Sequence, residues 1–136
     1  MEEPFLVGLP KGDDLIGAIT RVFRDRSVRK GAFSVIGAVS CATLGYYGVS
    51  HRYSNRQFQG MYEIVSCTGN VSEKEGEVFV HAHIVLSGED YRCFGGHLMP
   101  GTEIFAAEMF GTAVPGSSLV RKLDEATGLT LWPHAH

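Results

Sequence analysis

The chain has 136 residues, of which 44% are hydrophobic and 20% are charged, and its formal net charge is −3 at pH 7. This length and composition predict one domain, spanning residues 1–136, with a hydrophobic core of its own. The acidic balance argues against a domain that grips nucleic acid through excess lysine and arginine. No apolar run approaches the roughly 20 residues that span a bilayer.

The three cysteines, Cys41, Cys67 and Cys93, are an odd number without C-x-x-C spacing, so a disulfide framework is not expected. Free thiols are typical of a reducing compartment. The first residues lack the basic and long apolar segments of a signal peptide. We therefore expect a cytoplasmic protein, with Cys41 and Cys67 packed inside apolar strands.

The N-terminal part predicts an edge strand followed by the main helix. The apolar run PFLVGL ends at Pro10 and Gly12, and Asp13 is expected to cap a helix over about 13–26. Apolar residues recur in this segment at helical spacing and predict one buried face. They are Leu15, Ile16, Ile19, Val22 and Phe23.

The residues after this helix predict mainly β-strands. Residues 31–48 are expected to form two strands with a bulge or sharp bend near Gly37. The polar segment SNRQ, at 54–57, is expected to be a turn, and 58–71 and 78–88 are expected to be strands.

The C-terminal third predicts a short strand, a Gly-Pro turn and a long strand within residues 93–114. We expect the core to cover about 4–124 and the tail, about 125–136, to be flexible. One helix beside five or more largely antiparallel strands gives the α+β class.

Two histidines, His81 and His83, are two residues apart in the predicted strand VHAHIVLSG. Alternate strand residues point to the same face, so both imidazoles would lie side by side, close enough to share one ion. His97 follows two glycines in GGHLMPG, which would permit close backbone approach and a third imidazole from the neighbouring strand. Three neutral histidines and a water make a tetrahedral site that zinc accepts. Two satisfied polar side chains on a solvated face remain an alternative, because H-x-H is a weak motif.

Glu63 is a carboxylate in the otherwise apolar strand MYEIVS and therefore needs a partner. It can accept a hydrogen bond from a ligating imidazole, or act as a fourth ligand or general base beside metal-bound water. An ion pair with an arginine is the third possibility. The terminal pair His134 and His136 repeats the H-x-H spacing, but we expect it to be disordered.

Together these motifs resemble the PPC domain, which occurs alone in bacteria and archaea and follows AT-hooks in plant nuclear proteins. The matching segments lie between about Gly31 and Phe110: GAFSVIGAVSCATLGYY, GMYEIVSCTGNV, VHAHIVLSGEDYRCFGGHLMPGT and FAAEMF. The resemblance implies a compact α+β domain that assembles as a homotrimer. It also implies a metal site at His81, His83 and His97, and places Glu63 on the family's glutamate.

Proteins of this family are commonly labelled DNA-binding, which implies a role attached to transcription. An AT-hook needs an Arg-Gly-Arg-Pro core, and this sequence has none, so direct DNA binding is not expected. The first hypothesis is therefore a trimeric metal-binding module that acts through protein partners. The alternative is a metal-dependent enzyme acting on a small molecule, with Glu63 near the metal-bound water; a direct DNA binder ranks third.

Overall fold

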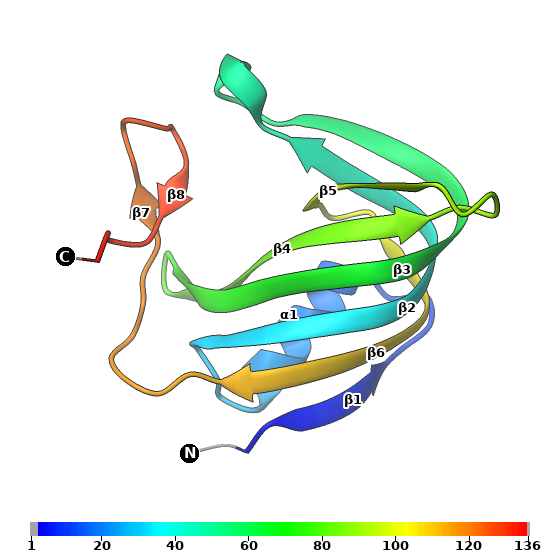
Figure 1. Cartoon of the computed structure of the whole chain (residues 1–136). Coiled ribbons are helices and arrows are strands. Elements are labelled where there is room, and N and C mark those ends of the chain that lie inside the picture. Colours follow the sequence, from blue (N-terminus) through cyan, green and yellow to red (C-terminus); the bar gives the residue numbers. More distant parts are fainter. Residues whose placement is uncertain (1–2, 136) are drawn as a thin grey trace.

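The computed structural model describes residues 3–135, and within them it confirms the α+β class, with one α-helix and a mostly antiparallel sheet (Figure 1). The elements in chain order are β1 (Phe5–Leu9), α1 (Leu15–Asp25), β2 (Gly31–Tyr46), the 3-10 helix η1 (Gly48–Ser50), β3 (Ser54–Lys74), β4 (Glu77–Ser87), β5 (Cys93–Leu98), β6 (Glu103–Ala113), β7 (Lys122–Leu123) and β8 (Thr130–Leu131). The expected edge strand is β1, and the expected short and long strands of 93–114 are β5 and β6.

The main sheet has the order β1-β6-β2-β3-β4-β5. The far end of β2 also pairs with β5, through Leu44 opposite Leu98 and Gly45 opposite His97. Because β2 has β3 and β6 as neighbours and meets β5 only at this end, the sheet curls until it closes on itself there. This closure holds β5 between β2 and β4.

Helix α1 packs on one face of the sheet and lies behind it in Figure 1. Its buried residues belong to the same hydrophobic core as the inward-facing strand residues; they are Leu15, Ala18, Ile19 and Phe23. The cap is Asp14 rather than the expected Asp13, since the Asp14 side chain accepts a hydrogen bond from the amide of Gly17. Asp13 instead forms an ion pair with Arg21.

Strand β2 is one continuous strand rather than the two that were expected. The bend predicted near Gly37 is present as a register shift between Val35 and Gly37. Gly37 has a φ of 145°, and a Cβ atom there would lie 2.1 Å from the carbonyl oxygen of Ala106. A glycine at this position lets the strand bend without being interrupted.

One further expectation is wrong: residues 54–57 begin β3, and the chain turns earlier, at η1. The segment expected to be a flexible tail contains β8, which pairs with β7, and the Tyr47 hydroxyl donates a hydrogen bond to the Thr127 carbonyl at 2.6 Å. The C-terminal hairpin, residues 122–131, therefore docks against the rest of the chain. His134 is exposed, and His136 lies outside the described residues.

All three cysteines are free thiols. Cys67 is buried, and burial raises the pKa of its thiol to about 12. Cys41 is only half-buried, and Cys93 is exposed. Within residues 3–135, no helix has the length and apolar character needed to cross a membrane.

Candidate metal centre

The three predicted histidines come together on the face of the sheet opposite the core. His81 and His83 alternate along β4 with the buried Ala82, and His83 lies directly opposite His97 on β5. One ligand nitrogen from each imidazole lies within 4.8 Å of the other two. The ring centroids are 5.1–5.6 Å apart. Such a triad can hold a divalent metal ion.

The glycines before His97 allow this approach, as the sequence predicted. A Cβ atom on Gly95 would lie 2.4 Å from the Ile84 carbonyl oxygen, and one on Gly96 would lie 3.0 Å from the Gly45 carbonyl oxygen. A side chain at residue 95 would not fit at 2.4 Å from this carbonyl oxygen unless the backbone shifted. The two glycines thus let β5 lie against both β4 and β2.

The environment of the triad favours the neutral imidazole at His81 and at His97. Burial, followed by the charges of Arg121, His97 and His83, lowers the pKa of His81 to about 4. Burial also lowers the pKa of His97, with smaller contributions from His83 and Arg121. Because a metal binds neutral imidazole, these histidines need not release a proton first.

Arg121, from the C-terminal hairpin, lies against His81. Its Nη2 atom donates to Asn70 Oδ1 at 2.9 Å and to His81 Nδ1 at 3.4 Å. The guanidinium lies over the rings of Phe79 and Trp132, with centroid distances of 5.6 Å and 4.7 Å. The residue is buried, and burial lowers the pKa of its guanidinium. A cation is therefore held beside the first metal-ligand candidate.

Tyr53 is the second polar neighbour of the triad. Its hydroxyl lies 3.4 Å from His97 Nδ1, and the two rings are 4.7 Å apart. Burial, with a smaller contribution from Tyr47, raises the pKa of the Tyr53 hydroxyl, so it stays protonated. Neither Tyr53 nor Arg121 was predicted as a site residue. Arg121 sits just before the segment that was expected to be flexible, and no motif marks either residue.

Two adjoining hollows flank the triad. One, of about 370 Å³, lies between the triad and the C-terminal hairpin and contains Arg52, Lys74 and Arg121. The other, of about 540 Å³, is lined largely by apolar or small residues such as Ile84, Val85 and the glycines before His97. Among the described residues, no aspartate or glutamate lines either hollow. The site is therefore open to a ligand and basic on one side.

The structure does not bring Glu63 to the triad. Glu63 pairs with Ser87, four residues beyond His83 on β4, which is about 13 Å along the strand. Its side chain is exposed. Within one chain, Glu63 is therefore too distant to be a ligand, a general base or a hydrogen-bond acceptor for these imidazoles. The sequence predicted its strand correctly but not its position along that strand.

Comparison with models of known protein families shows the family to which this chain belongs. The model of the Plants and Prokaryotes Conserved (PCC) domain, also written PPC, matches residues 1–114. The chain belongs to the PCC domain family. The resemblance noted from the sequence motifs is thereby confirmed, and residues 1–114 include all three histidines. No curated protein matches the chain.

Several solved structures share this fold. A metal-containing protein from Archaeoglobus fulgidus is 36% identical, with a TM-score of 0.92 and coverage of 98% of this chain and 94% of that one. A PPC protein from Pyrococcus horikoshii is 33% identical, with a TM-score of 0.94 and coverage of 99% and 94%. A protein from Ralstonia eutropha JMP134, provisionally described as DNA-binding, is 25% identical, with a TM-score of 0.86 and coverage of 96% and 90%.

Proposed function

We propose that this protein is a single-domain, homotrimeric PCC protein of the cytoplasm that holds a divalent metal ion at His81, His83 and His97. It acts through contacts with itself and with protein partners. The observation that carries the proposal is the convergence of three imidazole nitrogens within 4.8 Å from two adjacent strands. The Archaeoglobus protein, 36% identical, is described as metal-containing, which supports the same property here.

Zinc is the metal that this donor set favours most. Three imidazoles with a free fourth position match the tetrahedral geometry that zinc adopts readily. Neutral imidazoles favour zinc, copper, nickel or iron over magnesium and calcium, which prefer oxygen ligands. No carboxylate lines the flanking hollows within residues 3–135, so oxygen-rich coordination has no support.

Metal content of the purified protein tests this proposal. We expect about one zinc ion per chain by inductively coupled plasma mass spectrometry, since three protein ligands complete one site. His97→Ala should lose it, while the matched variant His134→Ala, at an exposed histidine outside the triad, should retain it. A native protein free of stoichiometric metal, or a His97→Ala protein that keeps it, would refute the proposal.

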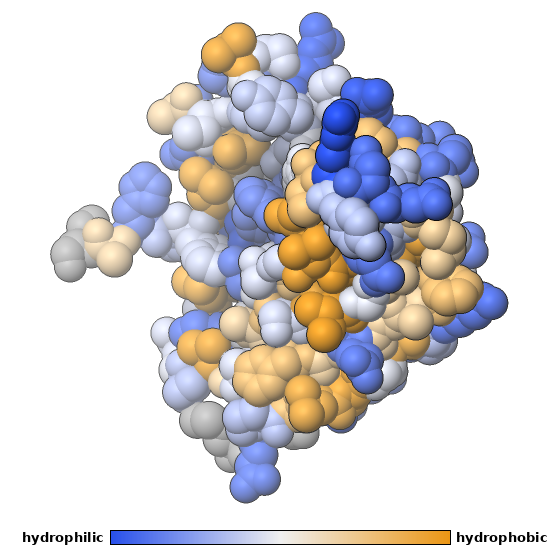
Figure 2. Space-filling view, turned by 45° about the vertical axis from the view of Figure 1, so that its right-hand side comes forward, coloured by the Kyte–Doolittle hydropathy of each residue, from blue (hydrophilic) through white to orange (hydrophobic). Residues whose placement is uncertain are grey.

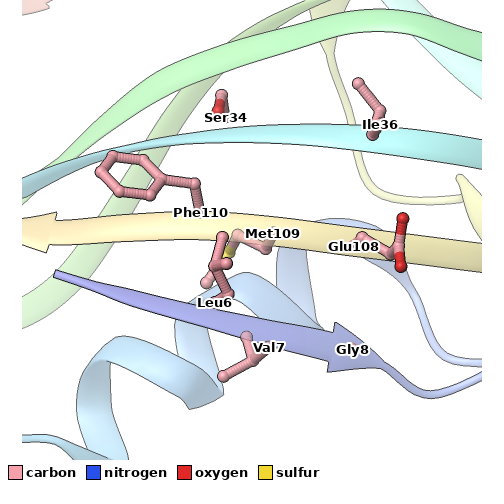
Figure 3. A pocket seen from close by; sticks show the side chains of 8 residues that line it. All are labelled: Leu6, Val7, Gly8, Ser34, Ile36, Glu108, Met109 and Phe110. Carbon is pink, nitrogen blue, oxygen red and sulfur yellow. The ribbon is translucent and has the colours of Figure 1, made fainter.

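Self-association is supported by an apolar surface on the outer face of β1, β6 and β2. Leu6 is 81% exposed, Ile36 57% and Phe110 42%, and they surround a hollow of about 480 Å³ (Figure 3). Other apolar side chains also gather in patches on the surface in Figure 2. Ser34 and Glu108 also line this hollow, but most of its lining is apolar, and exposed apolar surface favours a protein–protein contact. It suits the homotrimer implied by the family resemblance.

Direct DNA binding and catalysis have less support. The net charge of −3 opposes binding to the phosphate backbone, and we expect no shift of duplex DNA in a low-salt gel assay. The enzyme alternative relied on Glu63, which lies far from the triad within one chain. The two hollows offer no other carboxylate among the described residues as a general base.

A further inference from the structure

Arg121 is a buried cation that forms no ion pair with a carboxylate of residues 3–135. The residue is only 8% exposed. Its acceptors are all neutral: the Thr130 carbonyl at 3.2 Å, Asn70 Oδ1 at 2.9 Å and His81 Nδ1 at 3.4 Å. Its Nε atom has no hydrogen-bond partner among the described residues. Buried charges are normally paired, because an isolated charge loses its hydration without compensation. The guanidinium therefore lacks an anionic partner among the described residues.

The surroundings of Arg121 increase this positive character. Arg52 and Lys74 line the same hollow of about 370 Å³, and no acidic residue of the described part of the chain lines it. The aromatic rings of Phe79 and Trp132 hold the guanidinium in place. An anion entering this hollow would therefore meet three cations and no like charge.

A bound metal would leave Arg121 with one acceptor fewer. A neutral imidazole has a single nitrogen lone pair, and that of His81 at Nδ1 accepts from Arg121 Nη2 in the metal-free state. A metal at Nδ1 would occupy this lone pair, whereas a metal at Nε2 would require the proton to be on Nδ1. In both cases the contact between Arg121 and His81 is lost. The metal also adds positive charge beside the guanidinium, and an anion relieves both effects.

We propose that the hollow between the histidine triad and the C-terminal hairpin binds the oxyanion group, carboxylate or phosphate, of a small molecule. The anion lies beside the metal and accepts hydrogen bonds from Arg121, whose planar donor fork suits such groups. The adjoining hollow of about 540 Å³, lined by apolar residues such as Ile84 and Val85, receives the rest of the molecule. This inference rests on the proposed metal site and adds a ligand class to it.

Trp132 provides the readout. It is the single tryptophan of the chain, its ring centroid lies 4.7 Å from the Arg121 guanidinium carbon, and its indole N–H donates to Ser72 Oγ at 2.9 Å. Zinc-loaded protein is titrated with inorganic phosphate, acetate and hexanoate while the tryptophan emission is followed, and calorimetry repeats each titration. Saturable phosphate binding would identify a phosphate ligand, and saturable acetate binding a carboxylate. Tighter binding of hexanoate than acetate would show that the apolar hollow contributes.

Substitutions separate the proposed contact from general charge effects. Arg121→Gln should lower the affinity for the anion about 10- to 100-fold, which is the effect of removing a hydrogen bond to a charged group. The control Lys122→Gln removes one positive charge from an exposed neighbouring residue outside the hollow and should leave binding unchanged. If Arg121→Gln does not fold, Lys74→Gln replaces it as the test, with a smaller expected loss.

The metal dependence distinguishes failure of this inference from failure of the proposed function. Anion affinity should be higher in zinc-loaded than in chelator-treated protein, and by linkage the anion should raise the zinc affinity measured in competition with the same chelator by the same factor. Protein that retains zinc but binds none of the three anions, by emission or calorimetry, overturns the inference and leaves the metal site intact. So does zinc-loaded Arg121→Gln or Lys74→Gln with wild-type affinity. Protein that retains no zinc refutes the metal site itself.

Discussion

His83 on β4 lies directly opposite His97 on β5, with ring centroids 5.6 Å apart. The two ligand candidates are cross-strand neighbours, so their meeting depends on the register between β4 and β5. A slip of one residue would turn the His97 side chain to the other face of the sheet. The proposed metal site therefore depends on strand pairing as well as on three residue types.

Gly95→Ala tests this dependence on strand pairing. The new Cβ atom would lie 2.4 Å from the Ile84 carbonyl oxygen and would force β5 away from β4. We expect the free energy of unfolding to fall by about 1–3 kcal/mol, as for other overpacked contacts, and zinc affinity to fall with it. Urea unfolding and competition with a chromophoric zinc chelator measure the two effects. Gly8→Ala, where a Cβ meets nothing within 4 Å, should change neither, and an unaltered Gly95→Ala protein would contradict the account.

Tyr53→Phe tests the hydroxyl that lies 3.4 Å from His97 Nδ1. A metal-bound imidazole is oriented by a partner at its other nitrogen, and losing such a partner costs about 10–100-fold in metal affinity. We expect a loss near the lower end of this range, because the contact is long. Competition with a zinc chelator measures it. Tyr91→Phe, at a tyrosine that is 89% exposed, is the control; equal affinities for the two variants would show that Tyr53 does not orient His97.

The stability of the metal-free protein should fall as the solution is acidified. The pKa of His81 is about 4 in the folded chain, against 6.5 when unperturbed, so the unfolded state binds more protons between these values. The stabilisation is therefore present above pH about 6.5 and is lost as the pH falls through this window. Urea unfolding in the presence of a chelator measures the free energy of unfolding at pH 7 and at pH 5. Its decrease from pH 7 to pH 5 should be smaller for His81→Asn than for wild type. His134→Asn should behave as wild type, and an unchanged decrease in His81→Asn would be contrary to the expectation.

The exposed apolar face around Ile36 predicts how the proposed trimer responds to a new charge. Ile36→Asp adds a second carboxylate to the hollow of Figure 3, which Glu108 already lines, and burying both like charges against another chain would be unfavourable. We expect analytical ultracentrifugation to show trimers for wild type and smaller species for Ile36→Asp. Val49→Asp alters a residue of η1 that is 98% exposed and should remain trimeric. A trimeric Ile36→Asp protein would place the interface elsewhere.

Local patterns in the sequence predicted what strand and helix periodicity can determine. Alternation placed His81 and His83 on one face of a strand, and the glycines before His97 indicated the close approach of β5. Helical spacing identified Leu15, Ile19 and Phe23 as buried. Each of these features depends on residues that are near one another in the chain.

The remaining features depend on contacts between distant segments. Alternation predicts the face on which Glu63 lies but not its neighbour, and the pairing register sets it opposite Ser87. Arg121 meets His81 and Asn70, which precede it by 40 and 51 residues, only because the C-terminal hairpin folds back. Nothing in the local sequence around Arg121 marks such a contact.

X-ray absorption spectroscopy of the natively purified protein at the zinc edge tests the central claim most directly. The account predicts that zinc is coordinated by three imidazole nitrogens at about 2.0–2.1 Å and by one oxygen ligand such as water, with no sulfur ligand. The His83→Ala protein should have lost the signal. Scattering from sulfur at about 2.3 Å, which would point to a thiol such as that of the exposed Cys93, or a spectrum of hydrated zinc alone, would contradict a metal centre at His81, His83 and His97.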